Sequence, residues 1–166
     1  VLTHAALTEF IAIARAAGKP VVVDPKKGDY SQYRGATSLT PNQNEAAQAC
    51  ALPITDAASL DAAGSTLLTR TEAQAILITR GENGMALYEA SGQVHHLPTQ
   101  ATTVYDVTGA GDTVIAVYTT ALAGGASFAE AADLANHAAG LSVRVLGTAE
   151  VTAEQLWATL SQEDRD

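Results

Sequence analysis

The sequence predicts an α/β fold, in which helices cover a layered sheet. Short β-rich runs alternate along the chain with longer segments of helical composition, a pattern typical of such sheets. The run "VVVD" at residues 21–24 is continuously β-branched up to its acid, which indicates a strand buried on both faces, as in parallel sheets. The chain opens on a helix and has few strands ahead of its most distinctive motif, so we expect one part of a larger fold.

Glycine, proline and hydrophobic periodicity predict where the elements begin and end. The first helix is amphipathic and stops at Gly18, and Pro20 prevents its continuation. Asn83-Gly84 is expected to supply the positive φ angles of a hairpin turn, and Ser91-Gly92 makes a second turn. In chain order we expect helix 7–17, strand 21–24, an apolar run at 36–40, a helix from about residue 42, helix 56–71, strands 73–80, 85–90 and 93–98, and helices 108–123, 128–145 and 152–160. Residues 1–160 are expected to belong to one domain, and residues 161–166 to a polar tail or linker.

Composition excludes several classes of function. The chain has 166 residues, with 9 Lys and Arg against 18 Asp and Glu, for a formal net charge of -9. Because no cluster of basic residues forms, nucleic acid is not an expected partner. The single Cys50 cannot form an internal disulfide, which indicates a reducing compartment. No apolar run reaches the ~18 residues of a membrane span and no signal peptide opens the chain, so we expect a cytoplasmic protein without a membrane partner.

The stretch "YDVTGAGDTV" at residues 105–114 is the most informative about chemistry. It is not a P-loop, because no Lys follows its glycines, and not a dinucleotide fingerprint, because Val114 stands where the third glycine would be. Glycines at the head of an apolar helix favour anion binding, since first-turn N–H groups lack partners and the dipole adds about half a positive charge. For an arbitrary G-x-G-D, a plain helix start with a stabilising acid would be the preferred explanation.

Asp112 is the residue that a plain helix start does not require. A carboxylate inside an anion site would compete with a bound phosphate unless it had a separate task. The economical task is to accept a proton from an alcohol that attacks the phosphoryl group held by its neighbours. We therefore predict Asp112 as the catalytic base, and the N–H groups around Gly109, Ala110 and Gly111 as the anion hole.

The full string D-x-T-G-A-G-D-T at residues 106–113 resembles the signature of the ribokinase-like, or PfkB-type, carbohydrate kinases. The resemblance implies a three-layer α/β sandwich with a mostly parallel central sheet, of which this chain is the C-terminal, nucleotide-binding part. It also implies that ATP donates its γ-phosphoryl group to a sugar hydroxyl, with Mg²⁺ as cofactor.

The segment "TPNQNE" resembles the N-x-x-E element of that family. The resemblance assigns Asn42, Gln43, Asn44 and Glu45 to the nucleotide phosphates, and Glu45 to Mg²⁺ through water. One carboxylate with amides suits Mg²⁺, which keeps several of its waters in proteins. Asn42 and Glu45 also have the spacing of a capping box, so a purely structural role stays open.

Three later segments resemble further parts of the family's nucleotide site. In "TRGENG", Thr79 and Gly81 correspond to the nucleotide-side loop, and in "LANHAAG", Asn136 corresponds to the helix residue that borders the adenine. The segment "VRVLGT" at residues 143–148, together with the backbone near Asp106 and Thr108, resembles the part that holds a monovalent cation such as K⁺ in many relatives.

Residues 21–42 and 97–114 resemble most closely the kinases of D-glycero-D-manno-heptose 7-phosphate, which serve ADP-heptose and lipopolysaccharide synthesis. "DPK" and "YRGAT" are the features that distinguish this branch. The branch implies a phosphate-facing Lys26, just beyond the end of "VVVD" where ligands bind in open α/β sheets; a solvated loop is the alternative. The lid and most sugar-binding residues would lie in an N-terminal part that this sequence lacks.

The resemblance carries expectations about partners as well. In the bifunctional form of these kinases a nucleotidyltransferase with an H-x-G-H motif follows; this chain has no such motif, so we expect that activity to be absent from it. A homodimer is a further expectation. Two other functions stay open, namely a kinase of another sugar, such as a pentose or fructose phosphate, and a nucleotide-binding module without turnover.

Two other features favour structural roles. His95 and His96 are adjacent on a predicted strand, so they point to opposite faces and cannot chelate one metal together. Trp157 lies one turn from Leu160 on the last helix and is expected to pack in the core.

Overall fold

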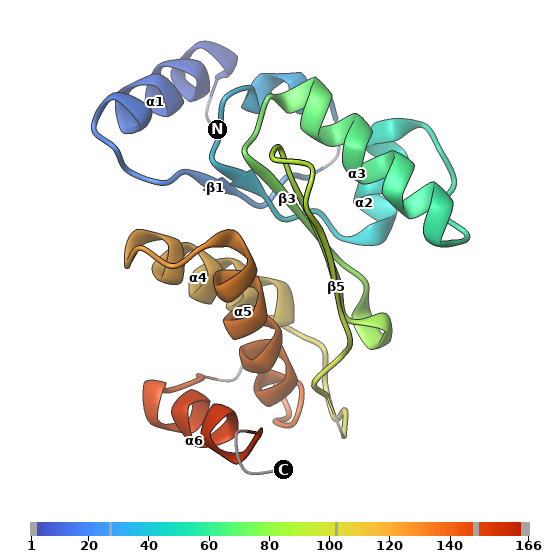
Figure 1. Cartoon of the computed structure of the whole chain (residues 1–166), viewed down its shortest axis with the longest axis vertical. Helices are drawn as coiled ribbons and strands as arrows, with labels where there is room; N and C mark the ends of the chain where they lie inside the picture. The colour runs from blue at the N-terminus through green and yellow to red at the C-terminus, as the bar shows by residue number, and fades with distance from the viewer. Residues whose placement is uncertain (1–2, 27, 102, 148–149, 164–166) are drawn as a thin grey trace. The chain divides into compact units, whose positions relative to one another are not determined.

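The computed structural model describes residues 3–26, 28–101, 103–147 and 150–163 (Figure 1). The helices are α1 (His4–Ala16), α2 (Gln43–Cys50), α3 (Ala57–Thr71), α4 (Ala110–Ala123), α5 (Phe128–Ser142) and α6 (Ala153–Glu163), with short 3₁₀ helices η1 (Tyr30–Tyr33) and η2 (Gly81–Asn83). The strands are β1 (Val22–Val23), β2 (Ser38–Leu39), β3 (Ala75–Thr79), β4 (Met85–Glu89) and β5 (Val94–Leu97). Within these described residues, no helix combines the length and the apolar content that crossing a membrane requires.

The strands form one mixed sheet in the order β1-β2-β3-β4-β5. β1 and β2 pair in parallel, as do β2 and β3, whereas β3 and β4 are antiparallel along their whole length. The α/β prediction is confirmed. The strands expected at residues 21–24 and 36–40 are shorter than predicted, since β1 and β2 have two residues each.

The chain divides into two compact units, which are residues 1–80 with 85–96 and residues 81–84 with 97–166. In the first unit, α3 packs on β3 and β4, and α2 packs on α3 and β3 (Figure 1). Ile76, Ile78 and Tyr88 of the sheet meet Leu60 and Leu67 of α3 in the core. The continuous apolar run of β3 is therefore buried, as a strand covered on both faces would be.

The second unit is built on the pairing of α4 with α5, and α6 packs on α5. Four alanines of α5 are fully buried, namely Ala131, Ala132, Ala135 and Ala138. Val114 and Tyr118 of α4 are buried as well. Small side chains on α5 allow its backbone to approach its neighbours closely, among them the segment that follows β5.

The connection between β3 and β4 differs from the predicted hairpin turn. Gly81 and Gly84 take positive φ angles of 57° and 73°, while Asn83 lies in the 3₁₀ helix η2 and does not. Gly84 donates its N–H to Gly81 O at 3.0 Å. The positive φ expected at Gly84 is confirmed and that expected at Asn83 is wrong, because the loop uses four residues and places its second left-handed residue at Gly81.

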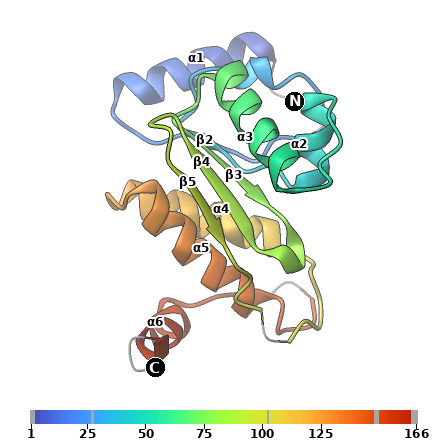
Figure 2. The same cartoon turned by 45° about the vertical axis from the view of Figure 1, so that its right-hand side comes forward.

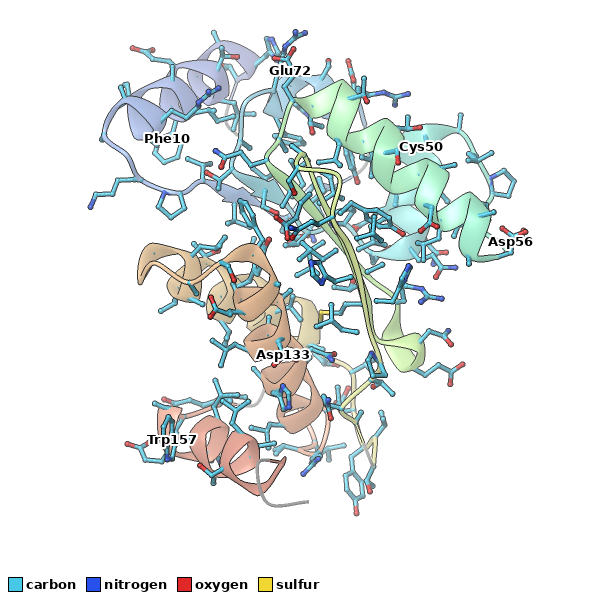
Figure 3. All side chains as sticks on the ribbon, in the orientation of Figure 1. Phe10, Cys50, Asp56, Glu72, Asp133 and Trp157 are labelled. Carbon is cyan, nitrogen blue, oxygen red and sulfur yellow. The ribbon has the colours of Figure 1, made fainter. Side chains whose placement is uncertain are left out.

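Two helices differ from their expected ends. α1 begins at His4, where the Thr3 hydroxyl accepts the N–H of Ala6. α6 continues to Glu163, three residues into the expected tail. The core role predicted for Trp157 is wrong, since 72% of this residue is exposed (Figure 3). On β5 the burial alternates as expected, and His95 and His96 lie near different carboxylates.

Replacing Gly64 by valine should destabilise the first unit. A Cβ at Gly64 would lie 2.4 Å from Cδ2 of the buried Tyr88 ring, whose hydroxyl donates to Asp61 Oδ1 at 2.9 Å. Such overpacking costs about 1–3 kcal/mol, which chemical denaturation of the full-length protein measures. Ala62→Val, on the exposed face of the same helix, carries the helix-propensity cost alone and should lose less than about 1 kcal/mol. Equal losses for the two variants would contradict the packing argument.

Candidate active site

In the first unit, three predicted site residues follow strands. Asn42 comes after β2, Thr79 ends β3, and Lys26 lies beyond β1. Parallel strands end at the same side of a sheet, where ligands bind in α/β folds. Asn42 and Thr79 form an isolated parallel bridge, and the Thr79 N–H donates to Pro41 O at 3.0 Å. The structure therefore brings Asn42 and Thr79 together.

Asn42 and Glu45 form the capping box that the sequence left as an alternative to metal binding. Asn42 Oδ1 accepts the Glu45 N–H at 2.9 Å, and Glu45 Oε2 accepts the Asn42 N–H at 2.9 Å. These bonds satisfy two backbone N–H groups at the start of α2. Asn44 lies exposed in the first turn of the same helix. The capping role is thus realised, and it holds both side chains at the end of β2.

Gln43 contacts a residue that the sequence did not single out. Its Nε2 donates to Ile54 O at 3.2 Å, and its Oε1 accepts from Arg80 Nε at 3.4 Å. Arg80 follows Thr79 directly, so this contact joins the first turn of α2 to the end of β3. The alternation of side chains along β3 could have signalled it, because Arg80 lies on the same face as Ile78, which packs toward the helices.

Lys26 pairs with a carboxylate of its own segment. Its Nζ lies 2.6 Å from Asp24 Oδ2, and 75% of its side chain is exposed. Exposed ion pairs of this kind contribute at most about 1 kcal/mol, so a phosphate would compete with Asp24 at little cost. The position fits both interpretations of Lys26, the solvated loop and the phosphate contact.

In the second unit, Asp106 organises the loop before α4. Its Oδ1 accepts the Thr108 N–H at 2.9 Å and the Thr108 hydroxyl at 2.7 Å, and its Oδ2 accepts the Gly147 N–H at 3.0 Å. These hydrogen bonds, the Thr108 hydroxyl first, hold the pKa of Asp106 below its usual value. Asp106, Thr108 and Gly147 are thereby brought together, as a monovalent cation site in this region would require.

The start of α4 differs from the other helix starts. Gly109 is its N-cap, with φ of 80°, and within the described residues no side chain caps it. Around a Cβ built at Gly111, no described atom outside its immediate neighbours and helix backbone lies within 4 Å. Asp112 is exposed in the first turn. First-turn N–H groups beside open space are the arrangement that binds phosphate at helix N-termini.

The two remaining predicted residues of this unit have different surroundings. Gly81 lies in open space at φ of 57°, so a ligand could approach its backbone. Asn136 is only 3% exposed, and its Nδ2 donates to Pro98 O at 2.7 Å. Its amide N–H is therefore engaged by the segment that follows β5.

The described residues contain no group of three or more His, Cys, Asp or Glu side chains that could hold a metal ion. A Mg²⁺ site made of one carboxylate, phosphate oxygens and waters needs no such group. Glu45 fits that arrangement, because Oε2 accepts one N–H and a carboxylate offers about four acceptor positions.

Comparison with known sequences gives the chain its relatives. The family profile described as "pfkB family carbohydrate kinase" matches residues 1–155. The bifunctional protein HldE of Trichlorobacter lovleyi is 49% identical over 166 residues, which are 100% of this chain and 34% of that protein. HldE of Geobacter sulfurreducens is 52% identical over 160 residues, 96% of this chain and 33% of that protein. The chain thus spans about a third of the length of these curated relatives.

Solved structures share the fold. Arabidopsis thaliana ribokinase, solved with ribose and ATP, matches with a TM-score of 0.85 and 24% identity, over 95% of this chain and 53% of that one. Escherichia coli phosphofructokinase-2, solved with potassium, matches with a TM-score of 0.84 and 19% identity, over 98% of this chain and 53% of that one. The predicted ribokinase-like α/β fold is confirmed.

Asp106→Asn should loosen the loop before α4. The pKa of Asp106 is lower in the folded protein than in the unfolded chain. Its carboxylate therefore stabilises the fold at any pH above the unfolded pKa, and this contribution is lost as the pH falls through the folded pKa. The variant keeps one acceptor oxygen and gains an NH₂ that cannot accept, so at neutral pH either the Thr108 N–H or the Gly147 N–H loses its partner, and amide exchange at one of the two at least should rise roughly 3–10-fold. Asp29→Asn, which breaks a similar turn at Ser31, should leave both amides unchanged; unchanged exchange in Asp106→Asn would contradict this role.

Proposed function

The chain belongs to the pfkB family of carbohydrate kinases, and we propose that the protein carrying it transfers the γ-phosphoryl group of ATP to a hydroxyl of D-glycero-D-manno-heptose 7-phosphate. The observation that carries this proposal is Asp112 in the first turn of α4, beside N–H groups that no side chain of the described residues caps. Identity of about 50% to bifunctional HldE proteins over the whole chain supports the heptose branch.

In the proposed reaction, Asp112 acts as general base. The sugar hydroxyl oxygen attacks the γ-phosphorus, the bond from that phosphorus to the β–γ bridging oxygen breaks, and ADP leaves with the bond's electron pair. The hydroxyl proton passes to the Asp112 carboxylate. The N–H groups around Gly109, Ala110 and Gly111 face the charge on the transferring group, where the positive end of the α4 dipole favours it.

The first unit supplies the proposed contacts to the nucleotide phosphates. Asn42, Gln43 and Asn44 present amides there, and Glu45 would hold Mg²⁺ through water. Bound Mg²⁺ neutralises phosphate charge as the γ-phosphoryl group leaves. The capping box supports this role, because it fixes the Glu45 carboxylate at the end of β2 before any ligand arrives.

Further residues complete the proposal. In this proposal Thr79 and Gly81 line the nucleotide site, Asn136 borders the adenine, and Lys26 faces a substrate phosphate. Asp106 and Thr108 contribute to a K⁺ site. We also propose that the protein is a cytoplasmic homodimer. We propose in addition that its polypeptide continues into a nucleotidyltransferase domain, which the word "bifunctional" in the relatives' name and their roughly threefold greater length support.

Substrate profiling tests the function. ADP release with Mg-ATP and the full-length protein should show a kcat/KM for heptose 7-phosphate at least about 100-fold above those for ribose and fructose 6-phosphate, because a site built for polar groups rejects analogues that lack them. A preference for another sugar would support the kinase reaction and contradict heptose 7-phosphate as the substrate. Turnover with none of them would remove the proposed function.

Asp112→Asn should reduce kcat by about 10²–10⁴-fold, the usual contribution of a general base. ATP affinity, measured with a fluorescent nucleotide, should stay within about threefold, because the first-turn N–H groups remain. Asp133→Asn, at an exposed position of α5, should leave kcat unchanged. Near-normal turnover in Asp112→Asn would remove this residue from the mechanism.

Glu45→Gln and Glu45→Ala separate capping from metal binding. Glutamine keeps an oxygen that accepts the Asn42 N–H, so stability should fall only in the alanine variant, by roughly 0.5–1.5 kcal/mol. Both variants lose the carboxylate, so the Mg²⁺ concentration for half-maximal activity should rise at least about tenfold in each. If Glu45→Gln keeps the wild-type Mg²⁺ dependence, Glu45 is only a cap.

A further inference from the structure

We infer that one face of α5, continued by the loop after it, positions the start of α4, and that Gly140 is the residue on which this depends. The inference rests on the proposed function, because the affected group is the Asp112 base. Gly140 and its partners touch no reacting atom, so they are positioning residues.

The segment after β5 lies along α5. Asn136 donates through Nδ2 to Pro98 O at 2.7 Å. One turn further along α5, a Cβ built at Gly140 would lie 2.9 Å from both C and O of Gln100. Figure 2 shows the segment passing the end of α5. Because the neighbour at Gly140 is backbone rather than a flexible side chain, a methyl group there would displace the segment.

The contacts continue in the same order beyond the helix. Val143 O accepts the N–H of Tyr105 at 2.8 Å and that of Asp106 at 3.3 Å. Gly147 then donates to Asp106 Oδ2 at 3.0 Å. Positions 136, 140 and 143 are spaced four and three residues apart, so they share one helix face. The face and its extension therefore contact the segment at successive points between residues 98 and 106.

This row of contacts ends at the anion site. Asp106 binds Thr108 through one carboxylate oxygen, and Val107 O accepts the Ala110 N–H at 3.2 Å. Gly109 then turns the chain into α4 with φ of 80°. A displacement at Gln100 is thereby transmitted to the first turn, where Asp112 lies.

The burial of Asn136 supports a positioning role for this residue too. It is 3% exposed and its amide N–H is engaged by Pro98 O. If Asn136 acted by direct contact with adenine, its truncation would change nucleotide affinity. If it acts through the segment after β5, truncation would change the geometry of phosphoryl transfer. The two roles are separable by kinetics.

Gly140→Ala in the full-length protein tests the inference. We expect kcat to fall by about 10–100-fold with KM for ATP within about threefold, since displacements near 1 Å can cost about 10²-fold in rate. Hydrogen exchange at the Tyr105 and Asp106 amides should rise at least about tenfold. Gly124→Ala is the matched control in the same unit: its Cβ would lie 3.3 Å from Ala121 O and far along α4 from the site, so kcat and both amides should be unchanged.

A purely structural glycine gives a different result. If Gly140→Ala lowers only the melting temperature, with kcat at 25 °C and the two amides as in wild type, the inference is overturned. If Gly140→Ala does not fold, Arg144→Ala takes its place, because the exposed Arg144 donates through Nη2 to Gln100 O at 3.4 Å. A fall in kcat at unchanged KM for ATP then supports positioning, and a rise in that KM at unchanged kcat overturns it.

Failure of the proposed function is distinguishable from failure of this inference. A wild-type protein without turnover on any sugar would remove the proposed kinase reaction. The exchange measurement needs no substrate, so faster exchange at Tyr105 and Asp106 in Gly140→Ala, and not in Gly124→Ala, would still support the positioning face. Unchanged exchange would overturn it.

Discussion

An α-helix begins with N–H groups that have no acceptor inside the helix, and each helix start must satisfy them from outside. Five helices of the described chain use a side chain for this, namely that of Thr3, Asn42, Asp56, Ser127 or Thr152. In the part of the chain that the structure describes, α4 has no such side chain and begins at Gly109 instead. Val107 O accepts the Ala110 N–H, and the N–H groups of the first turn that no side chain caps are the ones that we propose an anion occupies. The geometry of residues 98–109, which set where that turn lies, therefore has consequences for chemistry that the other helix starts lack.

The capping box of α2 shows why a structural role and a ligand role are not alternatives. Asn42 and Glu45 each accept the other's backbone N–H through the side chain. The Glu45 carboxylate has about four acceptor positions, so most of them stay available for a ligand. The same bonds remove side-chain freedom that a ligand would otherwise have to restrict. Since Asn42 also bridges to Thr79, the box is tied to the end of β3. Preorganisation of this kind lowers the cost of binding.

Local patterns predicted most of the fold, and the failures have identifiable causes. The helices, the buried β3 and the anion-site helix follow from periodicity, caps and glycines. A positive φ was expected at Asn83 and occurs instead at Gly81, beside the expected one at Gly84, because the sequence does not reveal the length of this loop. Trp157 was assigned to the core from spacing alone, which cannot show which face of α6 meets α5. The contacts Arg80–Gln43, Lys26–Asp24 and Asn136–Pro98 join residues whose geometry only the folded backbone fixes. The site residues are named by motif resemblance alone, and the structure adds the contacts that the segment before α4 makes with α5.

Under the proposed function, a chain with a net charge of -9 binds a polyanionic nucleotide without help from its overall field. At physiological ionic strength the Debye length is about 8 Å, so distant carboxylates are screened and local groups decide. Lys26 is paired with Asp24, and Arg34 with Glu72. The proposal assigns phosphate contacts to the dipole and backbone N–H groups of α4 in the second unit, and to a divalent cation that Glu45 would hold in the first. N–H groups act over a single hydrogen-bond length and lose strength steeply with misalignment. A site that depends on them is therefore sensitive to small displacements, which is why Gly140, which contacts the segment before α4 and not Asp112 itself, can matter to the chemistry.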